Sequence, residues 1–282
     1  MRIGEHARMK VPLLSTREIS GTAKDFITSA GECFAFFGPP TQDSGNLSYG
    51  VRVGDRRFFV KTTDPQAPVL LSFQERVALL RNAIGLSGRC DHPLLPRLLN
   101  VIESETGPLL VYEWVEGELL RAAKDDADSA HERFRRLPPA EIQRALDSLY
   151  GLHAALAELG YVAADFYDGC LIYDFAARSL HVVDLDHYQP GPFRNQMGRM
   201  FGSSRFMAPE EFELGARIDE RTTVFKLGRT ALLFLGDGGL DPSRFRGGEA
   251  LYQVAARACQ QNNVDRYGSV AEFNRAWLAA GA

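Results

Sequence analysis

Alternation of apolar and polar residues predicts a β-hairpin early in the chain. In SYGVRV-GD-RRFFVKT, two runs of strand-forming residues flank Gly54-Asp55, a favoured two-residue hairpin turn. Because successive side chains of a strand point to opposite faces, Phe59 and Lys61 should share one face, with Phe58 and Val60 on the other. A lysine on an otherwise apolar strand is a candidate functional residue.

Further strands and helices follow from the same patterns. Strands are expected in GECFAFFG, before a turn at Pro39-Pro40, over residues 109–115, and in LHVVDLDHY, which carries Asp184 and Asp186. Helical spacing is found over residues 70–84, 138–160, 224–235, 250–260 and 270–280. The segment KDDADSAHERFRR indicates a polar, solvated connector.

The helix expected over residues 70–84 carries a second candidate. Leu71, Glu75 and Ala78 or Leu79 fall on one stripe, which places Glu75 on or beside the buried face. Strands and one helix therefore come first, and mostly helices follow. This order predicts an α+β protein with two lobes.

Length and composition permit this architecture and argue against nucleic acid or a membrane as a partner. The 282 residues are 45% hydrophobic, enough for about two domains. A net charge of −4 gives no general attraction to nucleic acid or anionic membranes. No apolar run approaches the roughly 20 residues of a membrane span, and MRIGEHARMK lacks the apolar core of a signal peptide. The four scattered cysteines suggest reduced thiols and a cytoplasmic protein.

An ordered set of motifs from about Gly45 to Trp277 resembles the protein-kinase superfamily. The set comprises SGNLSYGVRV for the glycine-rich loop, FFVK for the lysine strand, LVYEWVEGE for the hinge, ADFYDGC for the catalytic loop, VVDLD for the metal-binding aspartate, GSSRFMAPEEF for the end of an activation segment, TTVFKLGRTALLF for the following buried helix, and VDRYGSVAEF for the final arginine motif. FMAPEEF is the most specific member.

The resemblance implies a two-lobed kinase-like fold. Residues 41–116 would form a small antiparallel β N-lobe with one main helix, and residues 117–282 a larger, mostly helical C-lobe. Residues 1–40 would be an N-terminal extension or an extra N-lobe element. Glu210 should pair with Arg266 and brace the C-lobe.

The resemblance also assigns roles in ATP-dependent phosphoryl transfer, which depends mainly on positioning and electrostatics. Lys61 would hold the phosphates and Glu75 would hold Lys61. The backbone at Glu113 and Val115 would bind adenine. Two aspartates complete the set, since Asp165 would orient or deprotonate the attacking hydroxyl and Asp184 would bind Mg²⁺.

Departures near the catalytic loop concern the second metal ligand. The family usually has an asparagine where this chain has Cys170, and a neutral thiol is a poor ligand for Mg²⁺. Asp168 could replace it, or could cap the loop. Asp186 resembles a second acid found in small-molecule kinases and could also compensate.

Departures in the N-lobe concern the nucleotide. The loop GNLSYGV is similar to that of aminoglycoside and choline kinases, where a side chain such as Ser48 or Asn46 could bind phosphate in place of glycine amides. An ordinary polar turn is the alternative. Phe59 stands where the family often has alanine above adenine, so it could stack on the base or fill the pocket.

Three functions remain open from the sequence. The first is a kinase, similar to bacterial enzymes of the eukaryotic serine/threonine type, with a protein hydroxyl as acceptor. The second is a kinase for a small-molecule hydroxyl, favoured by Asp186 and by the usual catalytic-loop arginine and lysine being Ala164 and Tyr167. The third is a pseudokinase that binds nucleotide or a partner without turnover, favoured by Cys170, Tyr167 and Phe59.

Overall fold

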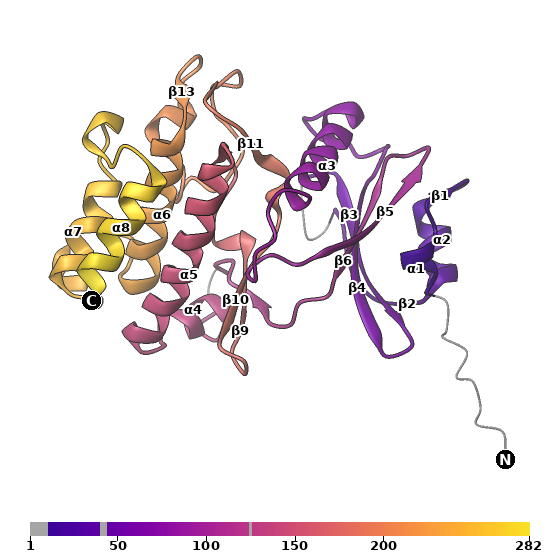
Figure 1. Ribbon diagram of the computed structural model, residues 1–282, viewed down its shortest axis with the longest axis horizontal. Coiled ribbons are helices and arrows are strands. Elements are labelled where there is room, and N and C mark those ends of the chain that lie inside the picture. Colours follow the sequence, from indigo (N-terminus) through magenta and orange to yellow (C-terminus); the bar gives the residue numbers. More distant parts are fainter. Residues whose placement is uncertain (1–10, 40–43, 124–125) are drawn as a thin grey trace. The chain divides into compact units, whose positions relative to one another are not determined.

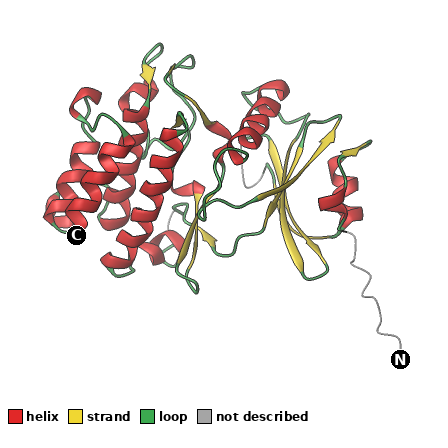
Figure 2. Ribbon diagram, in the orientation of Figure 1, coloured by secondary structure: helices red, strands yellow, loops and turns green. Residues whose placement is uncertain are grey.

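The computed structural model describes residues 11–39, 44–123 and 126–282 and divides the chain into two compact units (Figure 1). Unit 1 is Met1–Ser87 with Pro96–Trp114, and unit 2 is Gly88–Leu95 with Val115–Ala282. Strands dominate unit 1 and helices dominate unit 2 (Figure 2), so the α+β class expected from the sequence is confirmed. The turn expected at Pro39-Pro40 lies partly outside the described residues.

Unit 1 is built on a six-stranded sheet. Its elements are α1 (Pro12–Ser15), β1 (Glu18–Ile19), α2 (Ala23–Ala30), β2 (Glu32–Phe37), β3 (Asn46–Val53), β4 (Arg56–Thr63), α3 (Phe73–Ser87), β5 (Leu98–Ser104) and β6 (Leu109–Glu113). The strand order is β1-β5-β6-β4-β3-β2, and every pairing except β1 with β5 is antiparallel. The hairpin expected around Gly54-Asp55 is confirmed as β3 and β4.

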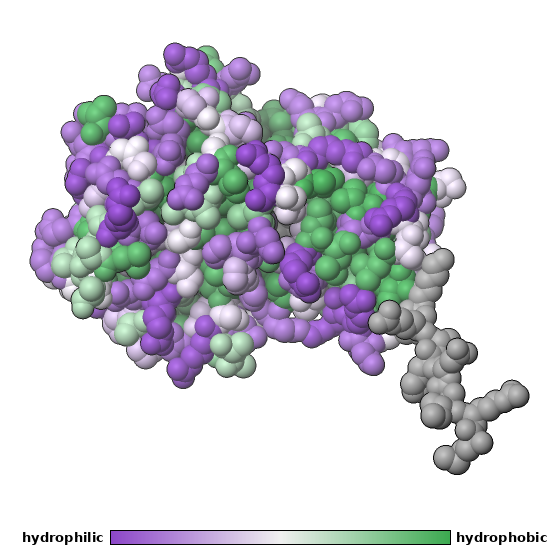
Figure 3. All heavy atoms as spheres, viewed as in Figure 1, coloured by the Kyte–Doolittle hydropathy of each residue, from purple (hydrophilic) through white to green (hydrophobic). Residues whose placement is uncertain are grey.

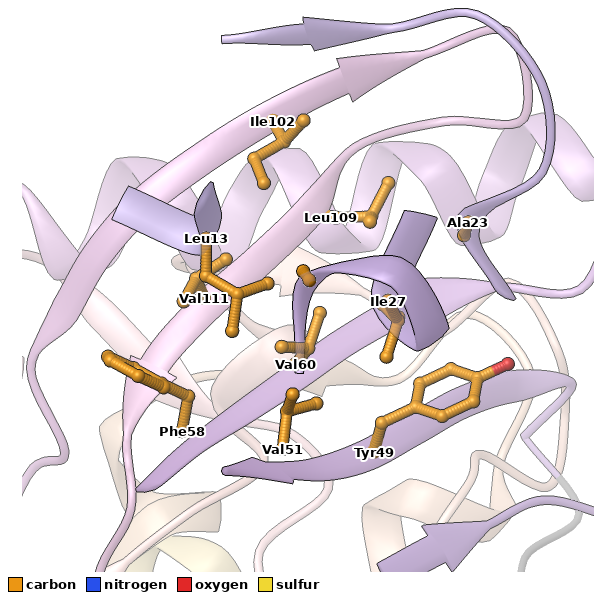
Figure 4. Close-up of a cluster of buried hydrophobic side chains, with 11 residues drawn as sticks. Leu13, Ala23, Ile27, Tyr49, Val51, Phe58, Val60, Ile102, Leu109 and Val111 are labelled. Atoms are coloured by element: carbon orange, nitrogen blue, oxygen red, sulfur yellow. The ribbon is translucent and has the colours of Figure 1, made fainter. Parts of the chain in front are cut away.

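One face of this sheet is sealed by the N-terminal helices. Leu13 of α1 and Ile27 of α2 pack on Val51, Phe58 and Val60 in a buried cluster (Figure 4). Phe58 and Val60 therefore occupy the face opposite Phe59 and Lys61, as the alternation predicts. Burial of such side chains contributes about 1.5–3 kcal/mol each, so α1 and α2 are part of the core of unit 1.

The other face of the sheet is partly covered by α3. Leu80 and Ala83 of α3 pack on Leu110 of β6, and the buried stripe of the helix continues through Arg76 and Leu86. The expected stripe containing Glu75 is thus wrong, because the side chain that turns inward is that of Arg76, while Glu75 is exposed.

Unit 2 combines four longer helices with short strands. Its elements are β7 (Glu118–Leu119), α4 (Ala130–Arg135), α5 (Pro139–Glu158), β8 (Tyr161–Ala163), β9 (Leu171–Asp174), β10 (Ser179–Val182), β11 (Tyr188–Pro190), β12 (Phe193–Arg194), β13 (Arg217–Ile218), α6 (Glu220–Leu235), α7 (Glu249–Ala258) and α8 (Val270–Gly281). The strands form β10-β9-β7, β11-β8 and β12-β13. The helices expected in the C-terminal half are confirmed, with ends that shift by a few residues.

Two expectations for unit 2 are wrong in part. The supposed polar connector contains α4, because His131 and Phe134 are buried and Phe134 packs edge-on against Phe234 and Tyr173. The strand expected in LHVVDLDHY ends at Val182, so Asp184 lies outside it.

The surfaces of the two units differ in hydropathy on the face shown in Figure 3. On the face shown, hydrophobic residues reach the surface over the strands of unit 1, whereas the helices of unit 2 present mostly hydrophilic residues. Within the three described ranges, no helix is both long enough and apolar enough to cross a bilayer.

Candidate functional site

Lys61 lies on the sheet face of unit 1 that α3 covers only in part. It stands opposite Ser48 of β3 and Leu110 of β6, so these three side chains share a face. Lys61 is 8% exposed and Ser48 is 2% exposed. A lysine held on a central strand has little freedom, which suits a group that must fix an anion in one position.

Aromatic rings gather on the same face beside Lys61. Phe59 and Phe37 are 6.3 Å apart between ring centroids. Phe34 reaches this face through a register shift in β2 and lies edge-on to Trp114, at 4.8 Å. Phe34 was missed in the sequence because strict alternation places it on the other face.

The Glu75 carboxylate is engaged in hydrogen bonds at the start of its own helix, α3. Its Oε2 accepts hydrogen bonds from the backbone amide of Ser72 at 2.8 Å and from the Ser72 hydroxyl at 2.7 Å, while Ser72 Oγ accepts from the Glu75 amide. This is a capping box, and its Ser-x-x-Glu signature stands in the sequence. The Ser72 hydrogen bonds hold the pKa of Glu75 below its ordinary value. Its pairing with Lys61 stays a prediction.

Arg76, the next residue, ties the glycine-loop region to the lysine strand. Its buried guanidinium donates to the carbonyl of Gly45 and, at 2.7 Å, to the carbonyl of Asp64 just after β4. Gly45 has a φ of 72°, a conformation that glycine adopts readily. Ser48 and Asn46, the expected phosphate ligands, lie within β3 rather than in the turn before it.

The expected hinge begins at the end of β6. The Glu113 amide already donates to the Arg97 carbonyl at 3.0 Å, and its carboxylate binds the Arg97 backbone and guanidinium at 2.9 Å. Val115, two residues later, is the first residue of the segment Val115–Ala282, which belongs to unit 2. Contact of either backbone with adenine stays a prediction.

The catalytic-loop candidate in unit 2 is anchored from three sides. The backbone amide of Ala163, at the end of β8, donates to Thr223 Oγ1 of α6 at 3.1 Å. Cys170 Sγ donates to the Asp165 carbonyl at 3.4 Å. A side chain on Gly202 would meet Asp165 Oδ1 at 3.0 Å, so the GSSR segment lies against this carboxylate. These contacts hold the backbone around Asp165 and place its carboxylate beside Gly202.

Asp184 converges on the same place from another loop. It has φ 64° and ψ 51°, a left-handed conformation that non-glycine residues rarely adopt and that often marks functional loops. Burial, followed by the charges of Asp184 and Asp165, raises the pKa of the Cys170 thiol well above its usual value. The same two charges help to raise the pKa of Tyr167, after burial and Cys170. Both carboxylates therefore act on one small region.

Asp168 has the contacts of a brace. It is fully buried, and its Oδ2 receives Arg205 at 2.5 Å and the Ala122 amide at 3.2 Å, with His131 at 3.3 Å. Burial alone would raise its pKa, but the hydrogen bonds from His131 and Arg205 hold that pKa below its ordinary value. Of the two roles left open by the sequence, these contacts match loop bracing.

A metal in unit 2 would need ligands from outside the protein. Asp186 is 4% exposed in the 3₁₀ turn Leu185–His187, directly after Asp184. In the part of the chain that the structure describes, no three or more His, Cys, Asp or Glu side chains are grouped to hold a metal ion. One or two carboxylates, completed by phosphate oxygens and water, are nevertheless a common way to bind Mg²⁺. The donor set therefore fits Mg²⁺ that arrives with a phosphate.

Two buried ion pairs hold the segment after the GSSR turn. Glu210 binds Arg266 through two hydrogen bonds of 2.7 and 2.9 Å, so the predicted pair is confirmed. Glu211 pairs with Lys226 of α6 at 2.8 Å, which the sequence analysis missed. Burial raises the pKa of Glu211, and the Lys226 charge opposes that rise.

Comparison with known proteins adds no assignment. No protein-family model matches this chain, and no curated protein matches its sequence. Its function must therefore be inferred from its own residues and geometry.

Proposed function

We propose that this chain is a protein-kinase-like phosphotransferase that moves the γ-phosphate of ATP to a hydroxyl group. The observation that carries the proposal is the convergence of Asp165 and Asp184, from two separate loops, on the buried Cys170 and on Tyr167. Carboxylates that act together on one small region are typical of sites that bind a cation or transfer a proton.

The elements of unit 1 support a nucleotide-binding role. Along the chain, β3 carries Ser48, β4 carries Lys61, α3 follows, and β6 leads to the expected hinge, which is the order of the kinase-like motifs. In the sheet, β4 lies between β3 and β6. Lys61 would bind phosphate oxygens of ATP. When bound, Mg²⁺ would neutralise charge on the transferred phosphoryl group. Asp184 and Asp186 would hold that ion.

Residues of unit 2 would prepare the acceptor. Asp165 would orient the attacking hydroxyl and accept its proton as the new O–P bond forms. The buried Cys170 would keep the loop in shape through its hydrogen bond to the Asp165 carbonyl. The GSSR segment against Asp165, braced by Glu210 and Arg266, favours a peptide Ser or Thr over a small alcohol as the acceptor.

A second function is favoured by one observation. Phe34, Phe37 and Phe59 crowd the face that carries Lys61. If they exclude ATP, the chain would be a pseudokinase that binds a partner without turnover. Whether these three aromatic rings admit or exclude ATP therefore decides between a kinase and a pseudokinase.

Replacement of the acid-base residue tests the proposal. Asp165→Asn should lower Mg²⁺- and ATP-dependent phosphorylation of a Ser/Thr peptide library by about 10²–10⁴-fold, because general-base catalysis contributes about that much. ATP affinity should stay within a few-fold of the parent. Phosphorylation retained by the variant would remove Asp165 from the chemistry, and a product formed only with small alcohols would reassign the acceptor.

A further inference from the structure

Phe34 reaches the Lys61 face through an extra residue in β2. Cys33 pairs with Val51 and Ala35 pairs with Gly50, so β2 advances two residues while β3 advances one. A bulge of this kind re-aims a side chain. An ideal Cβ on Gly50 would lie 2.8 Å from both Cε2 and Cζ of Phe34. The Phe34 ring thus occupies the position above Gly50 that a side chain would otherwise fill.

Under the proposed function, a base attached to a phosphate held by Lys61 would rest on the same sheet face, over Gly50 and Phe59. Gly50 is opposite Phe59, and Ser48, two residues away on β3, is opposite Lys61. Two residues along a strand correspond to about 7 Å. A planar base over Gly50 and Phe59 would therefore overlap with the present position of the Phe34 ring.

The same face gives the ring a place to go. Beyond Phe34, at the hairpin end, lies a hollow of about 370 Å³ lined by Phe34, Arg52, Gly54, Asp55 and Arg57. The Arg52 guanidinium, which also lines the hollow, already lies 5.9 Å from the Phe34 ring centroid, so a cation stands beside the ring on that side. Phe34 is partly exposed, which leaves it freer than a core residue to turn.

We propose that Phe34 is a specificity-determining residue of the nucleotide site. Its ring fills part of the base position beside Lys61 and turns toward the hairpin hollow when a base enters. The proposal rests on the proposed function, since it requires a nucleotide at Lys61. It explains how the face can be crowded with aromatic rings and still admit a planar ligand. It also predicts that removing the Phe34 ring strengthens base binding while leaving phosphate binding unchanged.

Binding of MgATP and of magnesium tripolyphosphate, measured by calorimetry, separates the base from the phosphates. Phe34→Ala should tighten ATP binding about two- to tenfold, the range of one aromatic contact, and leave tripolyphosphate unchanged. Phe36→Ala is the matched control, because Phe36 is also in β2, is 52% exposed and contacts Tyr49 on the opposite face. Phe34→Leu, which keeps apolar volume, should lie between the parent and Phe34→Ala.

Trp114 supplies an independent readout. It is 4.8 Å from Phe34, whereas Trp277, the other tryptophan of the chain, is fully buried in α8. ATP should change Trp114 emission in the parent, and Phe34→Ala should abolish most of that change.

Lys61→Ala makes the outcomes distinguishable. One outcome is that the parent binds ATP, that Lys61→Ala weakens this binding, and that Phe34→Ala leaves the affinity equal or lower. In that case the Phe34 proposal is overturned and the proposed function stands. If no variant binds ATP, or binding ignores Lys61, the proposed function fails and the Phe34 proposal falls with it.

Discussion

At the scale of single residues, burial decides what Cys170 can do. Its side chain is fully buried, its thiol has a raised pKa, and its Sγ–H donates to the Asp165 carbonyl. A thiol in this state is neutral and is no ligand for a hard cation. Cys170 therefore shapes the loop, and under the proposed function metal binding would fall to Asp184 and Asp186.

His153 of α5 is a second buried group whose chemistry is set by its surroundings. Its Nε2 lies 2.8 Å from the hydroxyl of Tyr188, and its Nδ1 lies 2.9 Å from the Leu149 carbonyl. Burial lowers its pKa from 6.5 to about 4. The unfolded chain therefore binds the proton more readily, and stability that is present above pH 6.5 is lost as the pH falls toward 4.

We expect this histidine to contribute about 2 kcal/mol to the fall in unfolding free energy between pH 7 and pH 5. Urea unfolding of the parent and of His153→Gln at both pH values measures the contribution, because other titrating groups are common to both proteins. An equal pH dependence in the two proteins would show that folding does not change the pKa of His153.

At the scale of elements, α6 is held to its neighbours by buried charge. The Glu210–Arg266 pair is almost fully buried and also receives the Thr222 hydroxyl at 2.8 Å. Removing one partner leaves the other charged and desolvated. Arg266→Ala should therefore lower the free energy of unfolding by about 3–5 kcal/mol.

Arg81 provides the matched control for that prediction. It makes two hydrogen bonds to Glu103 in unit 1, but its side chain is 48% exposed. Arg81→Ala should cost no more than about 1 kcal/mol, as exposed pairs do. Denaturant unfolding of both variants checks the contrast, and similar losses would mean that burial does not set the value of the Glu210 pair.

The start of α3 offers a second test at this scale. If Glu75 acts only as the partner of Ser72 in the capping box, Glu75→Ala and Ser72→Ala should reduce helix stability alike and change ATP affinity little. Lys61→Ala should reduce ATP affinity strongly. Calorimetric titration of the three variants with MgATP decides the matter, since a loss in Glu75→Ala that matches Lys61→Ala would restore Glu75 as the lysine partner.

At the scale of the whole molecule, much of the architecture is predictable because it follows from periodicity. The alternation around Phe58 and Lys61 gave the hairpin and its faces, and helical spacing gave α5 to α8. The pairing of Glu210 with Arg266 followed from the resemblance. The Glu75 cap was also predictable, because its Ser-x-x-Glu signature is local.

Other features depend on contacts far apart in the sequence and could not be predicted. A bulge at Phe34 breaks the alternation, and only the pairing of β2 with β3 reveals it. The helix α4 is short and polar, and it is held by Phe134 against Phe234. Asp184 lies beyond the end of β10 and has a left-handed backbone, a state that tertiary structure must impose.

Thermal unfolding with ATP, with and without Mg²⁺, tests the central claim most directly. At about 100 times the dissociation constant, a ligand stabilises by about 2.7 kcal/mol, which should raise the midpoint by roughly 5–10 °C for a chain of this size. We predict a rise with MgATP in the parent, a smaller Mg²⁺-dependent part in Asp184→Asn, and little rise in Lys61→Ala. The absence of any rise in the parent, with or without Mg²⁺, would contradict the phosphotransferase and leave the pseudokinase that binds a partner.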